Sequence, residues 1–149
     1  MRTQIYLALL LVAVAVTGCA TRYQPDSFNG GYTDVQLNAT TFRISVEGNG
    51  YTSTDRAQKI ALLRAADLTL QSGGTHFIVE GQNIASQQVG VTPATATIVG
   101  GTLIVNQGSP IIKPNGTMIM RIVRAGDPLF STAYDAAIIK AQLTPQLTQ

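Results

Sequence analysis

Few side chains in this sequence could carry out acid–base, nucleophilic or metal-dependent chemistry. The chain has a single histidine, His76, and a single cysteine, Cys19. A catalytic triad needs a base beside its nucleophile, and a zinc site needs three or four protein ligands. Because His76 has no second histidine to join it, we predict no metal site and no cofactor.

Carboxylates offer the remaining route to catalysis. Glu47 and Glu80 both fall on predicted strands, and glycoside hydrolysis requires two convergent carboxylates. Solvent-facing strand positions also explain both residues, and we favour that interpretation. Asp67 follows Arg64 by one helical turn, where the two can form an ion pair worth about a few tenths of a kcal/mol. A cell-wall or lipid-modifying enzyme would need Glu47, Glu80, Asp67 or His76 in one pocket; we predict instead that the chain is not an enzyme.

Cys19 follows an apolar segment at the amino-terminus. The segment from Ile5 to Val16 carries no charge and would span about 18 Å as a helix, which is shorter than a membrane core of about 30 Å. Arg2 precedes it, as in a signal peptide. The sequence Val16-Thr17-Gly18-Cys19 resembles the lipobox of bacterial lipoproteins. This resemblance implies that residues 1–18 are a signal peptide, cut off before Cys19, and that the Cys19 thiol receives diacylglycerol.

An ordinary signal peptide, cut near Ala13-Val14-Ala15, is the alternative. The position of the only cysteine directly after the apolar segment favours lipidation. Two or three acyl chains would hold the protein stably on a membrane, whereas one chain binds only reversibly. In Gram-negative lipoproteins an aspartate after the cysteine favours the inner membrane, and here Ala20 follows Cys19. The resemblance therefore implies attachment to the periplasmic face of the outer membrane.

The charge of the chain argues against binding to polyanions. Ten Lys and Arg residues stand against eight Asp and Glu residues, and only 12% of the chain is charged. The basic residues are scattered rather than clustered. Because phosphate contacts dominate affinity for nucleic acids, we predict no nucleic-acid partner.

The mature chain divides into two predicted parts. Residues 19–40 hold the cysteine and then glycine, proline and polar residues without apolar periodicity, which predicts a flexible tether. Residues 41–149 are predicted to form a single α+β domain, a small and mainly antiparallel sheet packed by one long helix. The predicted order (β-α-β-hairpin-β-α) is strand 41–47, helix 55–71, strand 75–81, hairpin 96–105, strand 117–124 and helix 133–143.

Residue periodicity supports these assignments. Phe42, Ile44 and Val46 alternate with polar residues, as in a strand with one buried face. Alanines and leucines recur at helical spacing across the predicted long helix, and Gly73-Gly74 suits its carboxyl end. The last helix is expected to cover a sheet edge or the second face of the sheet.

A Gly/Thr-rich insertion occupies residues 82–116, and we expect its flanks, 82–95 and 106–116, to be irregular. Its centre has two β-forming runs around Gly100-Gly101, a turn typical of a hairpin. This apolar, uncharged hairpin could join the core sheet, or it could present an exposed edge to a partner strand. The residues expected to contact a partner in the second case are Ile98, Val99, Leu103 and Ile104.

Two motifs carry a family resemblance. The segments Gly48–Ser53 (GNGYTS) and Leu62–Leu70 (LLRAADLTL) resemble those of small, functionally uncharacterised envelope lipoproteins of proteobacteria, as do Gly31-Tyr32 and Ala133–Ala136. The resemblance implies lipidation and a βαβ-type core, and it carries over no catalytic residue. A structural or adaptor protein that contacts other envelope proteins is the leading hypothesis. An envelope stress sensor or regulator is the alternative.

Overall fold

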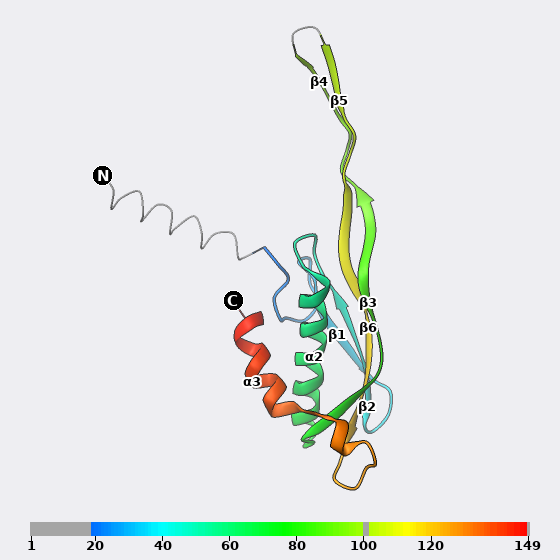
Figure 1. Ribbon diagram of the computed structural model, residues 1–149, viewed down its shortest axis with the longest axis vertical. Coiled ribbons are helices and arrows are strands. Elements are labelled where there is room, and N and C mark those ends of the chain that lie inside the picture. The colour runs from blue at the N-terminus through cyan, green and yellow to red at the C-terminus, as the bar shows by residue number, and fades with distance from the viewer. Residues whose placement is uncertain (1–18, 100–101, 149) are drawn as a thin grey trace, which may run out of the picture.

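The computed structural model describes residues 19–99 and 102–148 (Figure 1). The predicted signal peptide, residues 1–18, lies outside the described residues. The described chain is an α+β structure, in which an antiparallel five-stranded sheet packs against two helices, one of them long. The predicted fold class is therefore confirmed.

The sheet has the strand order β1-β2-β6-β3-β7, and every neighbouring pair is antiparallel. Its strands are β1 (Gly31–Gln36), β2 (Thr41–Glu47), β3 (His76–Val91), β6 (Pro110–Val123) and β7 (Tyr134–Asp135). The predicted strand 117–124 matches the end of β6, the central strand, except for Arg124, which lies just beyond it. A one-turn 3-10 helix, η1 (Phe130–Thr132), leads into β7.

Capping residues set both ends of the long helix, α2 (Thr54–Gln71). The Ser53 side chain accepts a hydrogen bond from the backbone N–H of Arg56 at 3.1 Å, and Asp55 lies in the first turn, where the helix dipole favours a carboxylate. After the carboxyl end, Gly73 adopts φ 71°, a left-handed conformation suited to glycine. The predicted helix at 55–71 is thus confirmed.

The core lies between α2 and one face of the sheet. Its fully buried large side chains include Ile44, Ile60, Phe77 and Met120, which belong to β2, α2, β3 and β6. Helix α3 (Ala136–Leu147) packs on α2, on the same side of the sheet (Figure 1). The last helix therefore covers neither a sheet edge nor the second face, because its apolar residues pack beside α2 instead.

The predicted tether of residues 19–40 is wrong for most of its length. Residues 31–36 form the edge strand β1, paired with β2 from Gly31↔Glu47 to Gln36↔Phe42. Thr21 is almost fully buried, and Tyr32 packs against the core. The segment has no apolar alternation because Asp34 and Gln36, which share the strand face of Tyr32, are polar, and Gln36 is exposed. It is nevertheless part of the folded domain.

Beyond the domain, β3 and β6 continue as a projecting two-stranded ribbon (Figure 1). Their pairing runs out to Val91↔Pro110, and the hairpin strands β4 (Thr95–Val99) and β5 (Thr102–Asn106) form a separate two-stranded sheet at the far end. We call residues 87–112 the arm. The hairpin strands are confirmed and lie outside the core sheet, while the irregular flanks predicted at 82–95 and 106–116 are largely strand.

Just before the arm, a glycine in β6, Gly116, allows close pairing of β6 with β3. Gly116 pairs with Ile84 and has φ 152°. A Cβ at this position would lie 1.8 Å from the backbone oxygen of Asn83, so no other residue could occupy it without displacing β3. This glycine therefore lets the two strands stay paired up to the start of the arm; their register shifts by one residue between Gln88 and Gly90.

Candidate functional site

The proposed catalytic residues are not brought together. Glu47 is exposed at the end of β2. Glu80 accepts a hydrogen bond from Arg121 Nε at 2.7 Å, and Arg121 also donates to Asp127 at 2.9 Å. These contacts raise the pKa of Arg121, with the Asp127 contact contributing most. Glu80 therefore belongs to a surface ion-pair network on the sheet face opposite the helices.

His76 lies at the start of β3. Its Nδ1 is 2.9 Å from Thr75 Oγ1, its Nε2 is 3.9 Å from Asp135 Oδ2, and its ring stacks on Phe130. Across residues 19–99 and 102–148, no group of three His, Cys, Asp or Glu side chains is arranged to hold a metal ion. Through its contacts with Phe130 and Asp135, His76 packs against the segment that joins β6 to α3.

Asp67 is nearly buried and links three segments. Its Oδ2 accepts a hydrogen bond from the Tyr23 hydroxyl at 2.5 Å, and its Oδ1 lies 2.7 Å from Lys140 Nζ on α3. Burial, followed by the contact with Asp67, raises the pKa of Tyr23 well above its usual range. The Asp67 carboxylate therefore links the amino-terminal segment and α3 to α2, and this contact explains its position without a catalytic role.

Arg64 does not pair with Asp67 as predicted. Its Nε donates to Asp34 Oδ1 on β1 at 2.7 Å, and its guanidinium lies over the Tyr32 ring, 4.8 Å from the centroid. Burial opposes the charge of Arg64, but the hydrogen bond with Asp34 and the contact with Tyr23 raise its pKa overall. The prediction failed because a helix pattern alone gives no information on β1, which supplies the actual partner.

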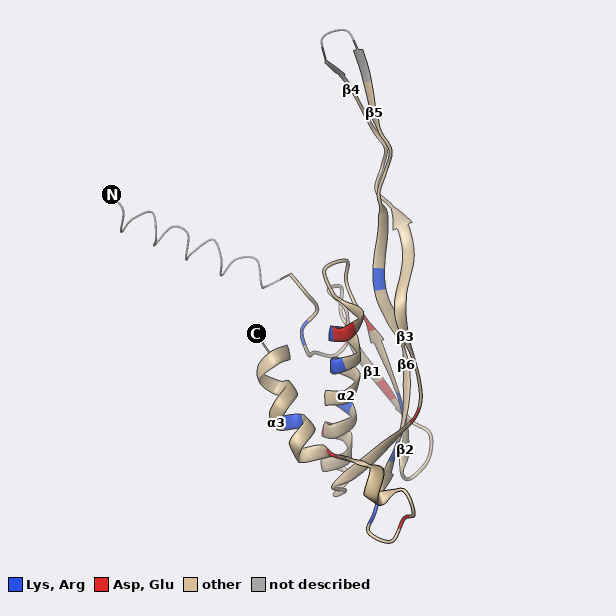
Figure 2. Cartoon of the chain, viewed as in Figure 1, with Lys and Arg blue, Asp and Glu red and all other residues tan. Residues whose placement is uncertain are grey.

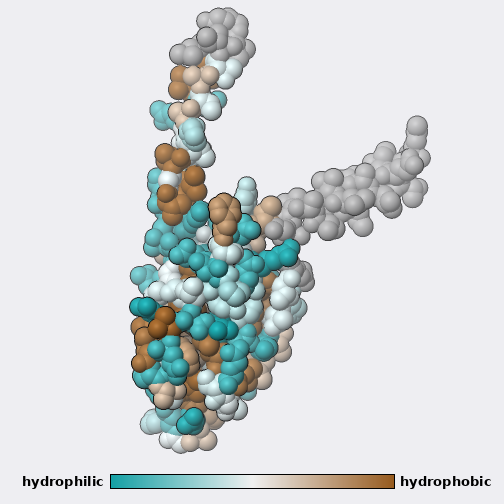
Figure 3. Space-filling view, turned by 180° about the vertical axis from the view of Figure 1, so that it is seen from behind, coloured by the Kyte–Doolittle hydropathy of each residue, from teal (hydrophilic) through white to brown (hydrophobic). Residues whose placement is uncertain are grey.

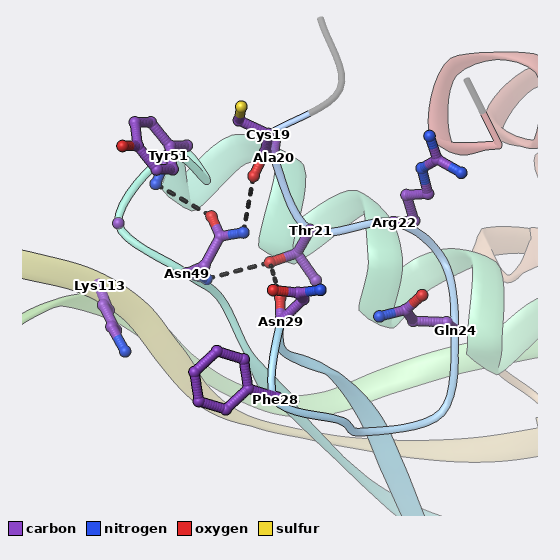
Figure 4. A pocket seen from close by; sticks show the side chains of 11 residues that line it. Cys19, Ala20, Thr21, Arg22, Gln24, Phe28, Asn29, Asn49, Tyr51 and Lys113 are labelled. Carbon is purple, nitrogen blue, oxygen red and sulfur yellow. Dashed lines mark hydrogen bonds between the residues drawn. The ribbon is translucent and has the colours of Figure 1, made fainter.

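The residues that follow Cys19 are held tightly by the loop before α2 (Figure 4). Thr21 N–H donates to Thr52 Oγ1 at 2.8 Å, and Asn49 N–H donates to Thr21 Oγ1 at 3.0 Å. Asn49 Nδ2 donates to the carbonyl of Cys19 at 2.7 Å. From α2, Arg56 Nε donates to the carbonyl of Thr21 at 2.7 Å. We call this set of hydrogen bonds the clamp.

The clamp borders a pocket of about 620 Å³ beside Cys19 (Figure 4). Two cationic side chains, Arg22 and Lys113, line it. So do Phe28 and Tyr51, whose exposed fractions are 103% and 77%. None of the described residues lining the pocket is acidic. The Cys19 end of the domain therefore combines positive charge with exposed aromatic surface.

The arm has the opposite character. Its sequence contains no Asp, Glu, Lys or Arg, and the charged residues in Figure 2 end at Lys113, at its base. None of its described residues is buried, and its apolar side chains include Val91 at 60% and Val105 at 58% exposure. Figure 3 shows apolar patches on the coloured part of the arm, below its grey tip. A two-stranded ribbon without a covering layer is only marginally stable in water.

Of the four hairpin residues proposed to contact a partner, only Ile104 has a described side chain, and it is exposed. The side chains of Ile98, Val99 and Leu103 lie outside the described part of the structure. The sequence did not predict the clamp, although its loop residues lie in the Gly48–Ser53 motif. The motif points to a tight turn, but its partner Thr21 is distant in sequence and could not be inferred.

Among the described helices, none is both long and apolar enough to cross a membrane. Comparisons of the chain with protein-family models, with curated proteins and with solved structures gave no match. The resemblance to envelope lipoproteins thus rests on the sequence motifs and stays a prediction.

Proposed function

We propose that this chain is an envelope lipoprotein, anchored by lipid on Cys19 to the periplasmic face of the outer membrane, and that it acts as an adaptor through protein contacts of its arm. The exposed, uncharged arm is the observation that carries the proposal. Soluble proteins seldom keep such apolar surface in water without a partner.

Strand pairing is the contact that best suits the arm. At Val91↔Pro110 and throughout β4 and β5, each strand is paired along one edge only, within the ribbon. An outer edge of this kind can accept a strand from another protein through main-chain hydrogen bonds. The absence of charge along the arm removes the usual protection of such edges against pairing.

Lipidation at Cys19 is compatible with the geometry around it. The Cys19 side chain is exposed, while its carbonyl is held by Asn49. A thioether to diacylglycerol would therefore point outward without disturbing the clamp. Two or more acyl chains would keep the domain at the membrane, with each buried CH₂ contributing about 0.8 kcal/mol.

A photoreactive amino acid at Ile104 in intact cells tests the adaptor role. We expect a discrete adduct with one envelope protein, and its loss when Cys19→Ser mislocalises the chain. The matched control is the same photoreactive residue at Ile138, an exposed apolar position on α3. Equal adducts from both positions, or none from Ile104, would contradict contact through the arm.

A further inference from the structure

The Cys19 end of the domain carries a second contact surface. We propose that Arg22, Phe28, Tyr51 and Lys113 form a surface that binds the phosphate headgroup layer of the membrane, so that the domain lies against the lipid rather than standing away from it. We call these four residues the headgroup surface. The proposal rests on lipidation at Cys19, as argued above.

The clamp leaves little free chain between the lipid attachment point and the folded domain. Thr21 is almost fully buried, and the Cys19 carbonyl is already bonded to Asn49. One residue of extended chain spans at most about 3.6 Å. Because Cys19 itself lines the pocket, acyl chains on its sulfur would bring the pocket rim to the level of the headgroups.

The chemistry of the headgroup surface suits that environment. Tyrosine and other aromatic rings with one apolar and one wet side are enriched at membrane interfaces. The Phe28 ring is fully exposed, and burying it in the interface would remove that apolar surface from water. Lys113 and Arg22 line the same pocket as these rings, Arg22 on the opposite side of it (Figure 4), and both carry the positive charge that phosphate oxygens attract.

The lining of the Cys19 pocket is positively charged, while Glu47 lines an adjoining pocket with Phe28 and Lys113. None of the described residues lining the Cys19 pocket is acidic. At the other end (Figure 1), the segment after β6 places Asp127 beside Arg121, which neutralises that cation. At the Cys19 end, Arg22 and Lys113 line one pocket together with the exposed rings of Phe28 and Tyr51.

The chain contains no tryptophan, so one introduced indole reports on a single position. We would purify the full-length protein from membranes with Phe28→Trp and reconstitute it in phosphatidylglycerol vesicles that contain brominated lipid. Leu129→Trp, an exposed position in the segment between β6 and η1, is the matched control. The mass of each preparation reports separately whether acyl chains are attached to Cys19.

The expected result is a blue-shifted emission that brominated lipid quenches at position 28 and leaves unchanged at position 129. Equal, water-like emission from both positions would overturn the headgroup surface, whereas a mass without acyl chains would overturn the lipid anchor instead. A second measurement uses residues 19–149 with Cys19→Ser, which lack the apolar segment Ile5–Val16, and flotation with the same vesicles. Arg22→Gln and Lys113→Gln should each lower binding about fivefold, with little effect on phosphatidylcholine vesicles. Unchanged binding would overturn the role of the two cations.

Discussion

The domain and the arm share two strands, β3 and β6, yet these strands are stabilised in different ways in the two regions. In the domain, β3 buries Ile84 to 6% exposure beneath α2 and its neighbours, whereas farther along the same strand Val91 is 60% exposed. The ladder of main-chain hydrogen bonds continues through both regions. The same ladder therefore runs through a region with buried side chains and a region without them, and we expect burial to make the first region the more stable.

This contrast predicts that the arm opens more readily than the domain. Local unfolding costs least where few apolar groups are buried and backbone hydrogen bonds are exposed to water. Such a segment can change conformation without disturbing the clamp around Thr21. The following predictions test this division, starting with the largest expected effect.

Truncation of the core should cost most. Phe77 is fully buried between β6 and β7, and Phe77→Ala removes a large side chain from a packed site. We expect the free energy of unfolding to fall by about 3–5 kcal/mol, measured by urea denaturation. A loss below 1 kcal/mol would mean that the domain core is not what stabilises the chain.

Breaking the Tyr23–Asp67–Lys140 link should cost less. Tyr23→Phe removes a hydrogen bond to a buried carboxylate, and we expect a loss of about 1–3 kcal/mol. Because the pKa of Tyr23 is raised in the folded state, its contribution to stability is complete below the usual value of 10.0 and declines above it, where the unfolded chain ionises first. Denaturation at increasing pH should show a steeper decline for the native chain than for Tyr23→Phe. Parallel curves would contradict the link.

Loosening the clamp should affect motion more than stability. Asn49→Ala removes the hydrogen bond to the Cys19 carbonyl and the two that Asn49 Oδ1 accepts from Tyr51 N–H and Thr52 Oγ1, each worth about 0.5–1.5 kcal/mol. The lone cysteine allows a spin label at position 19 in unlipidated protein. The label should be restricted in the native chain and mobile in Asn49→Ala. Equal mobility in both proteins would show that the clamp does not hold this end.

Substitution in the arm should have the smallest effect. Val91→Thr keeps a β-branched side chain at an exposed position, so we expect the free energy of unfolding to change by less than about 0.5 kcal/mol. Partner cross-linking from Ile104 is the readout that should weaken. A large loss of stability would indicate that the arm packs on the domain.

The sequence was most informative where one face of an element is buried. Phe42, Ile44 and Val46 alternate because β2 lies on the core, and the boundaries of α2 follow from Ser53 and Gly73. These features are local in sequence, so periodicity and capping residues predict them. The antiparallel α+β architecture could be assigned on that basis.

Elements without a regular buried face were missed. In β1 the core-facing Asp34 is polar because Arg64 on α2 neutralises it, and that partner is distant in sequence. In the arm neither face is covered, so no alternation marks β3 beyond Ile84 or β6 before Gly116. The clamp between Thr21 and the loop at Asn49 likewise depends on a long-range contact. Such contacts leave no signal in a single sequence.

Removing the arm tests the central claim most directly. Gln88 and Ile112 face each other across the ribbon, so an Asn-Gly turn can replace residues 89–111. We predict that this chain keeps the unfolding free energy of the domain and its membrane attachment, and that cells producing it behave like cells lacking the protein. Loss of folding, or full function without the arm, would contradict the division between an anchoring domain and a contact arm.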